Sequence, residues 1–108
     1  MVIVSKGRLN ENGIQGITWS EFCTILRGYG NKASLQIEFI DGSSVSYLVL
    51  KGKFEYHFMG NQLISFKGNE SIYRLKQESV NTVEQVQNQP IFYIFMKNKI
   101  TCKISVLV

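Results

Sequence analysis

The sequence predicts an α+β fold: a strongly bent or partly closed antiparallel sheet of about six to eight strands, with one short helix packed on it. Two apolar–polar alternating runs flank an aspartate–glycine turn within residues 35–50. Short polar turns separate most of the later apolar runs, and such connections favour antiparallel neighbours because parallel crossovers need a dozen or more residues. One segment near the N-terminus has apolar residues at helical spacing. We therefore expect a single globular α+β domain over residues 1–108.

The stretch Leu35–Leu50 is the strongest strand signal in the chain. Apolar and polar residues alternate in the first half and at the start of the second, which is typical of strands with one buried face. Asp41-Gly42 lies between the two halves. This dipeptide favours a type I′ turn, because both central residues of that turn need positive φ. The stretch predicts an antiparallel hairpin beside which the other strands are added.

A short helix is predicted over residues 18–28. Thr18 and Glu21 form a T-x-x-E capping box, in which both side chains satisfy backbone amides that the helix leaves unpaired. Gly28 is placed to end the helix. A helix of this length persists only by docking an apolar stripe on the sheet. The stripe consists of Trp19, Phe22, Cys23, Ile25 and Leu26.

The remaining apolar runs predict the other strands. Val2–Val4 and Gly13–Ile17 are predicted to pair across an Asn12-Gly13 turn. Ile91–Met96 is apolar at every position, which is typical of a strand buried on both faces. Other predicted strands are Phe54–Met59, Gln62–Phe66, Ser71–Lys76 and Ile100–Val108, with turns at Lys51-Gly52-Lys53, Gly60-Asn61, Gly68-Asn69 and Lys97-Asn98-Lys99.

Two features leave alternatives open. Gln77–Gln89 carries valines at i, i+3 spacing but is rich in poor helix formers. We therefore expect this segment to be either a short helix or an exposed loop. Ile100–Val108 is either an edge strand that pairs with its copy in a homodimer or a strand covered by the N-terminal strand. We expect one core between helix and sheet, containing Trp19, Phe22, Leu26, Ile37, Phe39, Tyr47, Ile94 and Ile104.

Composition limits the class of protein. A net charge of +4 excludes an acidic DNA mimic and falls short of the dense basic clusters of dedicated nucleic-acid binders. Cys23 and Cys102 are too far apart for a CxxC pair, and we expect two buried free thiols, although a disulfide remains open. The N-terminus has no signal-peptide pattern, and no apolar run approaches a membrane span. We expect a soluble, cytoplasmic protein.

No residue pattern predicts catalysis or a cofactor. His57 lies two positions after Glu55, and a hydrolase would need Cys23 or Cys102 beside that histidine as nucleophile. No family-type signature surrounds either cysteine, and one histidine with two separated cysteines does not make a metal site. The glycines lack phosphate-loop spacing. The strand face of Phe54, Tyr56 and Phe58 suits a core better than base stacking.

We expect a non-enzymatic interaction protein that binds another macromolecule, most simply another protein. Its asparagine-, lysine- and isoleucine-rich make-up is typical of small proteins of AT-rich bacteria and their phages, which favours a phage or mobile-element inhibitor of a host system. The alternative is a nucleic-acid-binding module that uses lysines on turns. If the predicted turns alternate between two poles, the basic side chains gather at one pole and Asp41 lies at the other. The predicted partner-binding residues are Arg27, Lys32, Lys51, Lys53, Lys67, Lys97 and Lys99.

Overall fold

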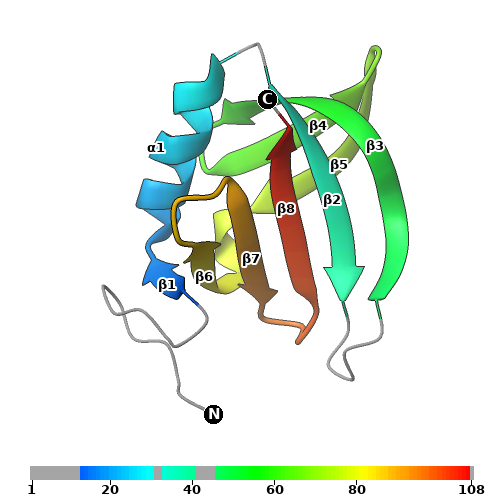
Figure 1. Ribbon diagram of the computed structural model, residues 1–108. Helices are drawn as coiled ribbons and strands as arrows, with labels where there is room; N and C mark the ends of the chain where they lie inside the picture. Colours follow the sequence, from blue (N-terminus) through cyan, green and yellow to red (C-terminus); the bar gives the residue numbers. More distant parts are fainter. Residues whose placement is uncertain (1–12, 31–32, 41–45, 108) are drawn as a thin grey trace.

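The computed structural model describes residues 13–30, 33–40 and 46–107. In the last range it describes the backbone throughout and the side chains only from residue 55 onward. Figure 1 shows one helix beside a strongly bent sheet. The elements in chain order are β1 (Ile14–Ile17), α1 (Trp19–Tyr29), β2 (Ser34–Ile40), β3 (Ser46–Met59), β4 (Gln62–Lys67), β5 (Glu70–Lys76), a 3-10 turn (Gln77–Ser79), β6 (Val80–Val86), β7 (Ile91–Met96) and β8 (Thr101–Leu107).

The strands form one antiparallel array in the order β1-β6-β7-β8-β2-β3-β4-β5. We call the part from β1 to the first half of β3 sheet A, and the part from the second half of β3 to β5 sheet B. β3 belongs to both, since residues up to Phe54 pair with β2 and residues from Glu55 pair with β4. The predicted α+β class with a bent antiparallel sheet is confirmed.

The hairpin predicted over Leu35–Leu50 is confirmed, because β2 and β3 pair antiparallel. The pairing register, however, is not the one that a two-residue turn would give. A turn centred on Asp41-Gly42 would pair Ile40 with Ser43, whereas Ile40 pairs with Ser46. Residues 41–45 lie outside the described part of the chain. The predicted turn at residues 51–53 is wrong, because β3 runs on as one strand. Register shifts against β2 absorb the extra residues there, as a β-bulge does.

The segment after β5 is a strand, so both structures predicted for Gln77–Gln89 are wrong. After the 3-10 turn, β6 pairs with β1 on one side and with β7 on the other. Its register with β7 shifts between Val80 and Thr82. This bulge adds one residue, so Val80 and Val83 both face the core despite their i, i+3 spacing. The spacing that suggests a helix is therefore produced by a bulged strand.

α1 begins as predicted and ends two residues later than predicted. Thr18 Oγ1 accepts a hydrogen bond from the Glu21 amide at 3.0 Å, and the Thr18 amide donates to Glu21 Oε1 at 2.8 Å. The helix ends at Gly30, whose φ of 62° suits glycine. Phe22 is fully buried and meets Phe92 edge-on at 5.0 Å between ring centroids. No helix of the described residues is long and apolar enough to cross a membrane.

The predicted core is largely confirmed. Five of its members are buried in one cluster with residues of sheets A and B, while Trp19 and Phe39 pack against it and remain partly exposed. The side chain of Tyr47 lies outside the described part. The five buried members are Phe22, Leu26, Ile37, Ile94 and Ile104.

The capping box gives a first testable prediction. We expect Thr18→Ala to lower the free energy of unfolding by about 1 kcal/mol, because the Glu21 amide loses its acceptor. The matched control is Thr24→Ala, which removes an exposed hydroxyl of the same helix that bonds only to the Ser20 carbonyl. Urea denaturation of both variants measures the difference. Equal losses for the two variants would contradict a special role for the cap.

Neither environment predicted for the C-terminal strand is observed. β8 lies between β7 and β2, with seven paired positions along β2. An interior strand has no free edge, so a homodimer by edge pairing of this strand is excluded. The predicted cover, Val2–Val4, lies outside the described residues, and β1 pairs with β6 instead.

Candidate functional site

The candidate site is the face of sheet A that points away from the core, here called the outer face. Side chains alternate between the two faces of a strand. Along β7, Phe92 and Ile94 are fully buried, whereas Tyr93 is partly exposed on the opposite face. The prediction that this strand is buried on both faces is therefore wrong. The outer face comprises Ile14, Gly16, Gln36, Glu38, Ile40, Thr82, Glu84, Val86, Ile91, Tyr93, Phe95, Thr101, Lys103 and Ser105.

No described helix or strand covers this face. In Figure 1, the side of β7, β8 and β2 that faces the viewer is open, while β4 and β5 lie behind them. The partly exposed side chains of Ile91, Tyr93 and Phe95 do not belong to the core cluster or pack against it. An aromatic and aliphatic strip therefore runs along the central strand of an open sheet surface. Such patches mark interaction sites more often than ordinary protein surface does.

Charged residues form a row across the strip. Glu84 on β6 is directly opposite Tyr93, and Tyr93 is directly opposite Lys103 on β8. Lys103 is in turn opposite Glu38 on β2, a favourable cross-strand pair. The Lys103 Nζ lies 5.9 Å from the centroid of the Tyr93 ring. Burial raises the pKa of the Glu84 carboxyl.

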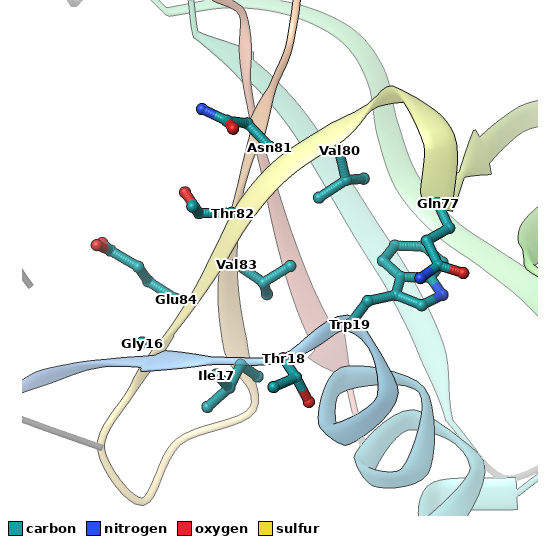
Figure 2. Close-up of a pocket in the computed structure, with 10 residues that line it drawn as sticks. All are labelled: Gly16, Ile17, Thr18, Trp19, Gln77, Val80, Asn81, Thr82, Val83 and Glu84. Carbon is teal, nitrogen blue, oxygen red and sulfur yellow. The ribbon is translucent and has the colours of Figure 1, made fainter. Parts of the chain in front are cut away.

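A pocket of about 410 Å³ lies at one edge of this face, where β1 ends and α1 begins. Figure 2 shows Val80 and Val83 on the Trp19 side of β6, and Thr82 and Glu84 on the other side. Glu84 is the one ionisable side chain among the residues that line the pocket. The full lining is Gly16, Ile17, Thr18, Trp19, Gln77, Val80, Asn81, Thr82, Val83 and Glu84.

The catalytic candidates His57, Cys23 and Cys102 lie in environments that do not suit a histidine-activated cysteine nucleophile. His57 is exposed on sheet B and stacks on Phe66, with 4.6 Å between the ring centroids. Cys23 and Cys102 are buried and free, which confirms the expectation of two free thiols. Burial raises the pKa of both thiols, and that of Cys102 reaches about 12. A thiol with a raised pKa is a poor nucleophile at neutral pH.

The aromatic residues of the second half of β3 face the helix. The Tyr56 hydroxyl donates to the Leu26 carbonyl at 2.8 Å. The Arg27 guanidinium carbon lies 4.5 Å from the centroid of the Phe58 ring. Both rings pack against the core cluster, so for these two residues the core interpretation is confirmed. The side chain of Phe54 is outside the described part.

The predicted basic residues do not gather at one pole. Thr101 pairs with Ile40, which places Lys97 and Lys99 at the end of the sheet where β2 finishes, away from Arg27 beside Phe58. The prediction of a shared pole is wrong for these two lysines, because residues 80–86 add a strand and reverse the chain direction once more. Lys67 is exposed at the end of β4. Lys32 and the side chains of Lys51 and Lys53 lie outside the described part.

Comparison of the chain with protein-family models, with curated proteins and with solved structures found no match. Tyr93 and Phe95 were not among the site residues predicted from the sequence. The signal was present, since Ile91–Met96 is apolar at every position and only one face of the strand is covered.

Proposed function

We propose that the protein is a non-enzymatic interaction protein that binds another protein through the outer face of sheet A. The observation that carries this proposal is the partly exposed strip of Ile91, Tyr93 and Phe95 at the centre of the surface formed by β1, β6, β7, β8 and β2. Tyrosine and phenylalanine are enriched at the centres of protein–protein interfaces, where they bury large areas at low entropic cost. Glu84, Lys103 and Glu38 supply the charged surroundings that set orientation.

The charge of the face favours a protein over a nucleic acid. Among the described side chains of the outer face, the carboxylates and ammonium groups are those of Glu84, Glu38 and Lys103, so their formal charges sum to −1 although the whole chain carries +4. Phosphate backbones are bound by clusters of lysine and arginine, and their affinity depends steeply on salt. The described side chains of the outer face, with two carboxylates and one ammonium group, do not form such a cluster.

The specific form that we propose is inhibition of a host protein by a phage or mobile-element product. The asparagine-, lysine- and isoleucine-rich composition supports this origin. An open apolar sheet face supports the mode of action, because docking on a target needs no catalytic group.

The test compares proteins captured from a lysate of the native host. The double variant Tyr93→Ser/Phe95→Ser is expected to retain at least tenfold less of a partner protein than wild type does, because it removes the aromatic centre of the strip. The matched control is Met59→Ser, which alters a 58% exposed residue on sheet B. Quantitative mass spectrometry measures retention. The proposal is overturned if wild type, double variant and control capture the same proteins in the same amounts.

A titration with mixed DNA and RNA at low and moderate salt tests the alternative. We expect no binding at moderate salt. Affinity that falls steeply with salt would favour the nucleic-acid-binding module in place of a protein partner.

A further inference from the structure

We infer that the outer face of sheet A takes a second copy of this chain, packed face to face around a two-fold axis that runs along β7. This inference goes beyond the proposed function and concerns the same surface, because a weak dimer would leave the face free for another protein at low concentration. Two independent features of the face support it: the distribution of charge across the face and the distribution of apolar side chains along its central strand.

The strand order defines what such an axis brings together. β6 and β8 flank β7 on opposite sides. A two-fold axis along β7, in the plane between the copies, lays β7 on its own copy and lays β6 on β8 of the other copy. Tyr93 then meets Tyr93 of the second copy at the centre. Ile91 and Phe95 meet their own copies on either side of it, which buries the apolar strip in a continuous seam.

The same axis makes the charges complementary. Glu84 and Lys103 occupy the same cross-strand row, one strand to either side of Tyr93. Each Glu84 therefore faces Lys103 of the second copy, and the pair occurs twice by symmetry. Partial burial of Glu84 raises its pKa in the isolated chain, and an ammonium group facing it would favour the ionised form.

The charges also select this axis over its alternative. A two-fold axis in the same plane but perpendicular to the strands would place Glu84 on Glu84 and Lys103 on Lys103. Like charges in contact are unfavourable. The axis along β7 also sets Thr82 against Thr101, and Glu38 against Gly16, which has no side chain to obstruct it. The pattern of the face thus fits one isologous arrangement.

The size of the face predicts a weak dimer. Five strands at the usual spacing, over three rows of outward residues, cover roughly 24 Å by 20 Å, or about 500 Å² per copy. A standard stable interface buries about 800 Å² on each partner. We therefore expect self-association that becomes measurable at high micromolar concentration. It differs from edge pairing, because β8 contributes its outer side chains and keeps both strand neighbours.

Charge reversal tests the inference. Glu84→Lys alone places two lysines against each other at both pairs, and Lys103→Glu alone places two carboxylates against each other. Each variant is expected to raise the dimer dissociation constant at least tenfold. An equimolar mixture of the two variants restores opposite charges at both contacts, so it is expected to regain dimer. Analytical ultracentrifugation of each variant and of the mixture measures this at high micromolar concentration.

Melting temperatures at low micromolar concentration show whether each variant still folds. The matched control is Arg74→Glu, which reverses an exposed charge of sheet B and is expected to leave dimerisation unchanged.

A wild type that stays monomeric at high micromolar concentration overturns the inference, as does a mixture that associates no better than its components. If the Tyr93→Ser/Phe95→Ser variant still loses a captured host protein in that case, the proposed function stands without self-association. If the chain dimerises as inferred but host capture is the same for all variants, the proposed host partner fails instead.

Discussion

Replacing Phe92 by alanine is expected to lower the free energy of unfolding by about 3–5 kcal/mol, the usual loss for an emptied core aromatic. Phe92 is fully buried at the centre of the cluster that joins α1 to sheets A and B. Its ring meets Phe22 of the helix edge-on. Truncation therefore creates a cavity at the contact between helix and sheet, where neighbouring strands limit collapse.

The same strand provides the control for this prediction. Phe95 lies on the outer face and is partly exposed. Phe95→Ala therefore removes the same atoms but opens no enclosed cavity, and we expect less than half of the loss. Urea denaturation at low micromolar concentration measures both free energies in the monomer. Equal losses would mean that the two faces of β7 have been assigned the wrong way round.

Features set by neighbouring residues were predictable from the sequence. The Thr18–Glu21 capping box acts over one helical turn, and it defines the helix start as predicted. The strands β4 and β5 follow from short runs between glycine turns, with Gly60 and Gly68 at positive φ. Each of these predictions uses information held within about ten residues of chain.

Features set by distant pairing were not predictable in the same way. Val80 and Val83 suggest a helical stripe until both are known to pair with β7, with a shift in register between Val80 and Thr82. Lys51-Gly52-Lys53 reads as a turn in isolation, whereas its position in β3 depends on pairing with β2. The place of β8 between β7 and β2 likewise depends on partners far away in sequence.

The candidate site depends on these distant pairings. Lysines on turns were predicted to gather at one pole, and the added strand β6 separates two of them from Arg27. The outer face can be recognised only from the strand pairing, which places Glu84, Tyr93 and Lys103 of three strands in one cross-strand row. A sequence shows which residues of β7 are apolar, but only the fold shows which of its faces no described helix or strand covers.

Stability is expected to fall steeply above about pH 9, because one buried thiol keeps its proton in the folded state. Burial raises the pKa of Cys102 to about 12 from an ordinary value near 9, and a hydrogen bond with Tyr73 opposes this to a smaller extent. Burial also raises the pKa of the Tyr73 hydroxyl. Below pH 9 the thiol is protonated in both states. Between pH 9 and pH 12 the unfolded thiol ionises first, so the folded state binds more protons and loses stability.

The size of this loss follows from the shift in pKa. Three units at about 1.4 kcal/mol each correspond to about 4 kcal/mol for Cys102 across the window. Urea denaturation under reducing conditions at pH 8, 9, 10 and 11 measures the slope. Cys102→Ala should flatten the slope, and the thiol accounts for the largest share of the slope between pH 9 and 10, where the Tyr73 phenol of the unfolded chain is less ionised than the Cys102 thiol.

Cys23 provides the matched comparison, because it is also a buried free thiol. Burial raises its pKa, and the nearby Arg27 guanidinium lowers it by less. Its smaller shift predicts that Cys23→Ala flattens the slope less than Cys102→Ala does. If Cys102→Ala and wild type lose stability equally between pH 9 and pH 11, the thiol of Cys102 does not keep its proton in the folded state. Burial of Cys102 then is not the cause of the alkaline sensitivity, and other groups whose pKa burial raises, such as Cys23 and Tyr73, must account for it.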